Sequence, residues 1–84
     1  MSIKIISVSN NLYIGTVEDI NPSFVVLKDV YTINNTIRDN KTIVLGKVKY
    51  IKKGIASFSQ FDYIADADDS LIELYMKVIS DGKA

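Results

Sequence analysis

Apolar and polar residues alternate along most of the chain before position 60, and this alternation constrains the fold more than any other feature. A period of two residues places successive side chains on opposite faces of a strand. The pattern therefore predicts β-strands, separated by turn residues such as Ser9-Asn10-Asn11 and Asn21-Pro22-Ser23. The predicted strands cover residues 3–8, 12–20, 24–33, 42–45 and 47–51.

Two glycines and one pair of isoleucines interrupt the strand pattern. Gly15 lies inside the second predicted strand, and Gly46 separates the last two. Glycine inside a strand lowers stability and marks a sharp bend or a close backbone approach. Ile5 and Ile6 are adjacent apolar residues, which predicts a bulge-like irregularity in the first strand. Short strands, bent at glycine and joined by tight turns, predict a small, strongly curved sheet or partly open barrel.

Near the C-terminus the spacing changes to that of a helix. Apolar residues recur at intervals of three and four over residues 69–81, which predicts a helix with one wide apolar face. They are Leu71, Ile72, Leu74, Tyr75, Met76, Val78 and Ile79. Ser70 and Glu73 fit a capping box at the start of this helix, and Gly82 is placed for a C-terminal cap. The apolar face must be covered, either by the sheet or by a neighbouring subunit.

The segment between the strands and the helix, residues 54–68, has a mixed pattern. Phe58, Phe61 and Tyr63 fit either an added strand or an irregular packed segment. We therefore predict a single domain of 84 residues, with barrel strands over residues 1–53 and the helix over 69–81.

A domain of this size has a marginal core unless something adds buried surface. The chain contains neither cysteine nor histidine. Disulfides and zinc sites built on these residues are therefore excluded, and oligomerisation is the natural source of further burial.

No catalytic site is expected. The common nucleophile–base triads and the thiolate or imidazole metal sites need the histidine and cysteine that this chain lacks. Residues 66–70 superficially resemble a calcium loop, but Leu71 occupies the glycine position and Lys77 the terminal glutamate position. We expect a protein that is not an enzyme and that uses neither a metal nor a cofactor.

The charges are balanced overall but unevenly distributed. A net charge of zero and a pI of about 6.1 argue against indiscriminate binding to nucleic acid. Four lysines nevertheless gather in one segment, at Lys47, Lys49, Lys52 and Lys53. They are either solvated strand residues or contacts to phosphates or to an acidic neighbour. Since no apolar run reaches the ~20 residues of a membrane span and no signal peptide is evident, we expect a cytoplasmic protein without membrane contact.

The strand residues resemble the two sequence motifs of the Sm-like (LSm) family. The first motif places an aromatic residue before a glycine, then a loop residue, then an apolar run that ends in an acidic residue. The corresponding positions are Tyr13, Gly15, Val17, Asn21, Leu27 and Asp29. The second motif resembles the run Ile43-Val44-Leu45-Gly46. This resemblance implies a strongly bent, five-stranded antiparallel open barrel, to which the chain adds a C-terminal helix.

Sm-like proteins act as rings, so the resemblance also implies a homo-oligomer. Sheet edges of adjacent subunits would pair head to tail and close at about five to seven copies. The implied interface residues are Val44, Val48, Tyr50 and Ile51.

The resemblance implies RNA binding, although the polar positions depart from the family pattern. Family members hold uridine with an aspartate, an asparagine, a stacking side chain and an arginine. Asn21, Ser23 and Leu45 replace three of these, and Phe24 offers either a stacking surface or a core side chain. The residues implied for nucleic-acid binding are Asn21, Ser23, Phe24, Gly46, Lys47 and Lys49.

Three functions remain open at this point. A ring could bind RNA or single-stranded nucleic acid weakly or with altered specificity. Alternatively, it could be a structural or protein-interaction scaffold that has lost RNA binding and docks a protein partner through its C-terminal helix. This chain resembles the compact Sm-like proteins of bacteriophages in lacking the usual N-terminal helix, and such an origin would fit the loss of RNA binding. The third interpretation is an unrelated monomeric barrel of the SH3-like or OB type.

Overall fold

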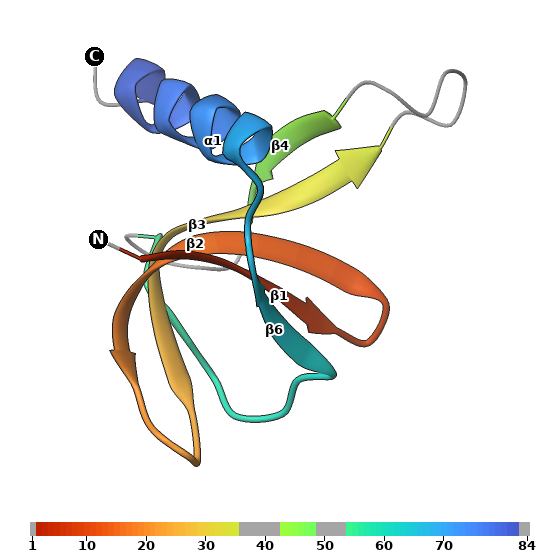
Figure 1. Ribbon diagram of the computed structural model, residues 1–84, viewed down its shortest axis with the longest axis vertical. Coiled ribbons are helices and arrows are strands. Elements are labelled where there is room, and N and C mark those ends of the chain that lie inside the picture. The colour runs from red at the N-terminus through yellow and green to blue at the C-terminus, as the bar shows by residue number, and fades with distance from the viewer. Residues whose placement is uncertain (1, 36–42, 49–53, 83–84) are drawn as a thin grey trace.

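A computed structural model describes residues 2–35, 43–48 and 54–82 of the chain. These residues form a mostly β fold with one C-terminal helix, as predicted (Figure 1). The elements are β1 (Ile3–Val8), β2 (Asn11–Ile20), β3 (Val25–Asn35), β4 (Ile43–Lys47), β5 (Ala56–Phe58), β6 (Tyr63–Asp66) and α1 (Asp69–Gly82).

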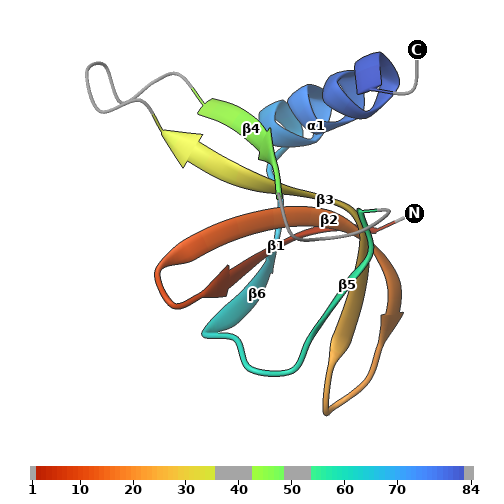
Figure 2. The same cartoon turned by 180° about the vertical axis from the view of Figure 1, so that it is seen from behind.

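The strands form one antiparallel sheet in the order β4-β3-β2-β1-β6, and β5 joins it through β3. β3 pairs with β5 over Val25–Leu27 and with β4 over Tyr31–Asn35. Figures 1 and 2 show a strongly bent sheet that does not close into a barrel. The predicted curved, open architecture is confirmed. The segment that the sequence left undecided supplies β5 and β6, so the described residues contain six strands.

Two β-bulges produce the bend. One extra residue lies in β3 at Asp29, and another lies in β2 at Glu18, as the shifts in pairing between the two strands show. Asp29 has a φ of 51°, the left-handed conformation of a G1-type bulge, which glycine usually occupies and aspartate tolerates. A bulge bends its strand and increases the local twist. The curvature of the sheet therefore originates where β2 and β3 pair.

Gly15 lies across the sheet from the Asp29 bulge. A Cβ atom at this position would lie 2.8 Å from the Cβ of Leu27 and 3.2 Å from the carbonyl oxygen of Lys28. Real Cβ atoms do not approach other atoms at 2.8 Å, so only glycine fits without a shift of the backbone. The predicted close approach at Gly15 is thus confirmed.

The other predicted interruptions are wrong. β1 pairs with β2 without a shift along its whole length, so there is no irregularity between Ile5 and Ile6. Both residues are apolar because the sheet is covered on both faces. β4 also passes through Gly46, which pairs with Thr32, and does not end there. Of the strand predicted over residues 47–51, Lys47 is instead the end of β4 and Val48 lies outside any strand, while residues 49–51 fall outside the described residues.

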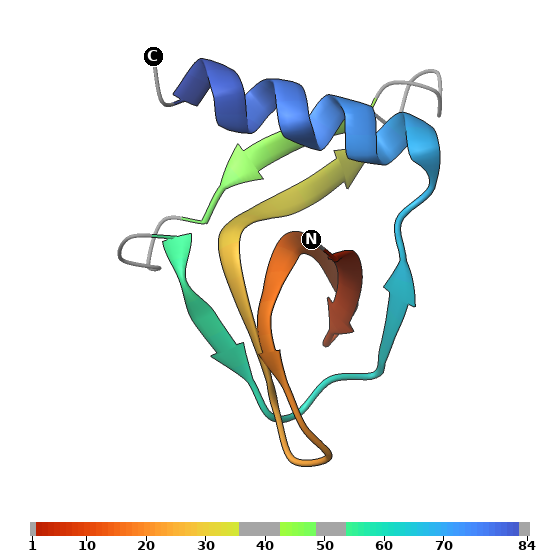
Figure 3. The ribbon, with the colours of Figure 1, turned by 60° about the vertical axis from the view of Figure 1, so that its left-hand side comes forward.

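Two hydrophobic clusters cover the opposite faces of the sheet. The first fills the concave side, with side chains from β1, β2, β3, β5 and β6; its buried members are Ile6, Val25, Leu27 and Val30. The second lies beneath α1, and its buried members are Ile14, Ala67, Leu71 and Tyr75. Figure 3 shows α1 crossing the sheet above β3 and β4. The apolar face of the helix is therefore covered by its own sheet, although Met76 remains exposed.

α1 begins at Asp69, as predicted, but its N-cap is Asp68, two residues before the predicted cap at Ser70. The Oδ1 atom of Asp68 accepts a hydrogen bond from the amide of Leu71 at 2.8 Å, and the Asp68 carbonyl accepts one from Ile72 at 2.9 Å. This is the geometry of an N-cap residue. The predicted capping box on Ser70 and Glu73 is therefore wrong, because Asp68 takes the capping role two residues earlier.

Replacement of Gly15 by alanine should lower the free energy of unfolding by about 1–3 kcal/mol, because the new Cβ overpacks against Leu27. Urea denaturation followed by circular dichroism measures this change. Gly46→Ala is the matched control, since its Cβ would meet side-chain atoms and no backbone, Thr32 Oγ1 at 3.1 Å and Asn34 Nδ2 at 3.5 Å. We expect a loss below about 1 kcal/mol there. Equal losses in the two variants would contradict a special role for Gly15.

Candidate functional site

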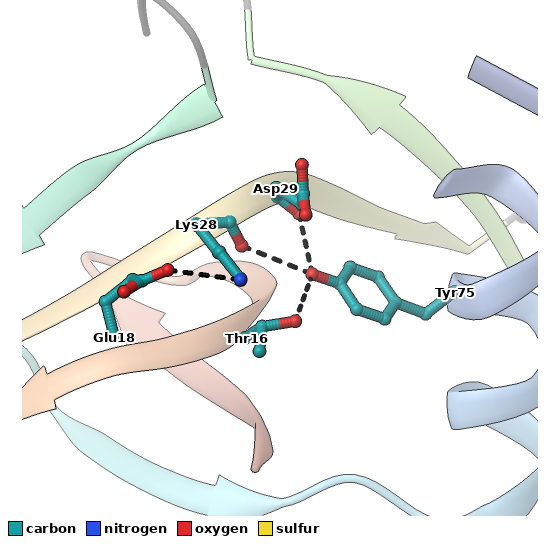
Figure 4. A network of polar contacts seen from close by, with 5 residues as sticks. All are labelled: Thr16, Glu18, Lys28, Asp29 and Tyr75. Carbon is teal, nitrogen blue, oxygen red and sulfur yellow. Dashed lines mark hydrogen bonds and ion pairs between the residues drawn. The ribbon is translucent and has the colours of Figure 1, made fainter. Parts of the chain in front are cut away.

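A network of hydrogen bonds surrounds the hydroxyl of Tyr75, whose side chain is fully buried. Its oxygen lies 2.9 Å from Thr16 Oγ1, 2.9 Å from the Asp29 carbonyl oxygen and 3.2 Å from the Lys28 carbonyl oxygen (Figure 4). Carbonyl oxygens only accept, so Tyr75 donates its single proton to them and Thr16 donates to Tyr75. The phenol thereby ties α1 directly to the bulge in β3.

The protonation of Tyr75 follows from its surroundings. Burial raises its pKa above the ordinary value of 10.0, the hydrogen bond with Thr16 acts in the opposite direction, and the negative charge of Asp29 adds to the rise. The phenol is therefore neutral at physiological pH. Because its side chain is fully buried, a substrate cannot reach it. We conclude that this network is structural and does not form an active site.

Two lysines of the sheet, Lys4 and Lys28, form ion pairs. Lys28 Nζ lies 3.2 Å from Glu18 Oε1, close to the Tyr75 network (Figure 4), and Lys4 pairs with Asp66 across β1 and β6. Such exposed pairs add little to stability. They do, however, neutralise two of the cations that could otherwise attract phosphate.

An open pocket lies where the β2–β3 turn meets the segment between β5 and β6. Its volume is about 520 Å³, within the ~300–1,000 Å³ that is usual for small-molecule sites. Its walls combine hydroxyl, amide, carboxylate and aromatic groups, and we call it the turn pocket. The lining residues are Val8, Ser9, Pro22, Ser23, Ser59, Gln60, Phe61 and Asp62.

Asn21 shapes the first wall of the turn pocket. Its Oδ1 atom accepts hydrogen bonds from the amides of Ser23 at 2.8 Å and Phe24 at 3.1 Å, and its own amide donates to the Phe24 carbonyl at 2.9 Å. An asparagine side chain used in this way holds a tight turn. The Asn21 amide oxygen is thus committed to the turn, while Ser23 faces the pocket.

Asp62 and Phe61 form the second wall. The amide of Asp62 donates to the Ser7 carbonyl at 2.7 Å, and the buried Ser7 hydroxyl donates to Asp62 Oδ2 at 3.3 Å. These bonds attach the segment between β5 and β6 to β1. Phe61 is 36% exposed, so part of its ring is accessible beside the pocket.

The structure brings together only part of the residues predicted for nucleic-acid binding. Asn21, Ser23 and Phe24 share the β2–β3 turn. Gly46 instead pairs with Thr32 near the opposite end of β3, beside α1 (Figures 1 and 2). Lys47 is the last residue of β4, and Lys49 lies outside the described residues.

The residues predicted for the subunit interface are also divided. Val44 lies in β4 and pairs with Asn34 of β3. Val48, in contrast, is half-buried and packs against the concave cluster. Tyr50 and Ile51 lie outside the described residues. Val48 therefore contributes to the core of its own subunit.

The sequence did not predict Ser59, Gln60, Phe61 and Asp62 as site residues. A signal was present, because Phe61 is an aromatic residue surrounded by polar ones and the strand pattern fails around it. The signal could not be assigned without knowing that this segment meets the β2–β3 turn, which lies almost 40 residues earlier.

A second, smaller pocket of about 290 Å³ lies near Gly46, between the β1–β2 turn and β3. Its Thr32 hydroxyl donates to the Gly46 carbonyl at 3.2 Å, and Asn34 Nδ2 donates to Thr32 Oγ1 at 3.3 Å. These polar groups satisfy one another. The turn pocket, with its exposed aromatic ring, is the stronger candidate site.

No protein-family model matches the chain, and no curated protein matches it. Within residues 2–35, 43–48 and 54–82, no three acidic side chains converge in a way that could hold a metal ion. The described helix is too short and too polar to cross a membrane.

The Tyr75 network generates a prediction about stability and its pH dependence. Tyr75→Phe leaves two partly buried carbonyls and the buried Thr16 hydroxyl without their partner, so the free energy of unfolding at pH 7 should fall by about 1–3 kcal/mol. Because the folded-state pKa is raised, the protonated phenol stabilises the fold below pH ~10, and this contribution is lost as pH rises through the folded-state pKa. The difference between wild type and variant should therefore be constant near neutral pH and shrink at alkaline pH.

Urea denaturation at several pH values measures this difference. Tyr63→Phe is the matched control, since the Tyr63 side chain is 51% exposed and donates no hydrogen bond to a described residue. A variant at position 75 as stable as that control would contradict the proposed role of the hydroxyl.

Proposed function

We propose that this chain is a subunit of a homo-oligomeric ring, assembled by head-to-tail pairing of its sheet edges. The supporting observation is the open sheet. Among the described strands, β6 pairs only with β1 and β5 pairs only with β3, although β5 and β6 are consecutive in the chain. Figure 3 shows these two strands on opposite sides of the bent sheet. Edge strands present unpaired backbone groups and can add a strand from another chain.

Exposed apolar side chains lie on or beside β5 and β6. Tyr63 on β6 is 51% exposed, and Ile55, immediately before β5, is 52% exposed. A domain of this size gains stability from any further apolar burial. Pairing β6 of one copy with β5 of the next would cover both residues at one interface.

The proposed contact is heterologous, because it joins two different edges. Such contacts close into rings when the rotation between subunits permits it and otherwise form filaments. The Sm-like resemblance and the bent, open sheet both favour closure, at about five to seven copies. The exposed side of α1 is mainly polar, with Glu73, Lys77, Ser80 and Asp81, which favours self-assembly over docking of an apolar partner on the helix.

A second candidate function is binding of single-stranded nucleic acid at the turn pocket. It is favoured by one observation: Ser23, from the predicted RNA-binding turn, shares this pocket with the exposed ring of Phe61. Aromatic side chains bind single strands by stacking on unpaired bases. Binding would thus use a different second wall from the Gly46 and Lys47 segment that the Sm-like resemblance implies.

Tyr63→Glu should dissociate the ring, because it places a charge in the proposed seam between β6 and the next subunit. The side chain is half exposed, so the subunit itself should remain folded by circular dichroism. Native mass spectrometry of protein purified without nuclease measures the assembly. Met76→Glu is the matched control, since Met76 is 42% exposed on α1, which lies over β3 and β4 and not along β5 or β6 (Figure 3), and should leave the assembly intact. A monomeric wild-type protein at micromolar concentration would refute the proposal.

Phe61→Ala should weaken binding of a short single-stranded RNA by about 1–3 kcal/mol, the usual contribution of one stacked base. Fluorescence anisotropy with a labelled hexanucleotide measures the affinity. Met76→Ala removes a similarly exposed side chain far from the pocket and should bind like wild type. Unchanged affinity in the Phe61 variant would remove the turn pocket from consideration as the binding site.

A further inference from the structure

We propose that the turn pocket selects guanine among the bases of a single-stranded nucleic acid, and that the carboxylate of Asp62 makes the selection. This inference rests on the second function proposed above. It concerns the chemical identity of the bound base, which the arrangement of Phe61 and Asp62 on one wall of the pocket constrains.

One oxygen of the Asp62 carboxylate, Oδ2, accepts a hydrogen bond from a described residue, and the other, Oδ1, accepts none. Its amide is fixed to the Ser7 carbonyl at 2.7 Å, and Ser7 Oγ approaches Oδ2 at 3.3 Å. No described residue donates a hydrogen bond to Oδ1, and the side chain as a whole is exposed. The carboxylate thus lines the pocket with acceptor capacity on both oxygens.

A carboxylate discriminates among the bases by the donors that they offer. Guanine presents two adjacent donors, N1–H and N2–H, on its Watson–Crick edge, and these match the two oxygens of a carboxylate. Adenine and cytosine present one amino donor beside a ring acceptor, and uracil presents one donor between two carbonyls. Bases in single strands are read on this edge. The opposed acceptors of the other bases would be repelled by Asp62.

The neighbouring lining groups complete a base-sized site. Phe61 directly precedes Asp62 and offers an exposed ring for stacking, so that one base could contact both residues. The hydroxyls of Ser9, Ser23 and Ser59 can donate or accept, and they can adapt to the remaining edge of the base.

The same residues set the dependence of binding on salt. The pocket lining contains a carboxylate and no lysine or arginine. Phosphate contacts make affinity fall steeply with salt concentration, because counterions are released. Binding at this pocket should therefore depend on the base and only weakly on ionic strength.

The test compares hexanucleotides by fluorescence anisotropy with the full chain. The labelled RNAs are UGUGUG, UAUAUA, UCUCUC and UUUUUU. We expect wild-type protein to bind UGUGUG about tenfold or more tightly than the other three. Asp62→Asn replaces one acceptor oxygen by a donor, so this preference should fall to within about twofold. Asp81→Asn removes the same charge from the exposed side of α1 and should keep the preference.

The outcomes separate this inference from the function on which it rests. Equal wild-type affinity for the four RNAs, or a guanine preference that survives in Asp62→Asn, would overturn guanine selection while leaving nucleic-acid binding in place. No binding of any hexanucleotide by the wild-type protein would overturn the binding function and the inference together.

Discussion

The Tyr75 hydroxyl of α1 donates a hydrogen bond to the carbonyl groups at the bulge of β3. A bulge leaves backbone carbonyls outside the regular ladder, and buried carbonyls need a donor. Tyr75 supplies that donor from α1, and Gly15 provides the space that lets β2 pass close to the bulge. Gly54 adopts a φ of 69° beside the Asp29 backbone. The bend of the sheet and the position of the helix are therefore determined together.

The turn pocket is a consequence of this bend. Because β3 changes direction at Asp29, one half of it pairs with β4 and the other half with β5. The chain leaving β5 then passes the β2–β3 turn before it returns along β1 as β6. Phe61 and Asp62 are thereby brought to Ser23. A flatter sheet would leave these segments apart, so the pocket depends on a bulge that lies outside it.

Local patterns predicted most elements of the fold, and interactions between distant residues account for what they missed. The alternation gave the first three strands, and the helical spacing gave α1. The same alternation failed at Ile5 and Ile6, because a sheet covered on both faces has no polar side. The bulge at Asp29 could not be predicted, since its partner Tyr75 lies 46 residues away. The turn pocket likewise joins segments that are remote in sequence, so only the part on the β2–β3 turn was foreseen.

The two proposed functions share one stretch of chain, and this has a physical consequence. Phe61 and Asp62 line the turn pocket, and Tyr63, the next residue, begins the edge strand β6. A neighbouring subunit paired with β6 would hold the backbone of Tyr63 and so restrict the motion of the pocket wall. A ligand that binds only this ordered wall would stabilise the assembly by the same free energy by which assembly favours the ligand. Ring formation and base recognition would therefore be coupled through a single peptide segment, with no movement of the core required.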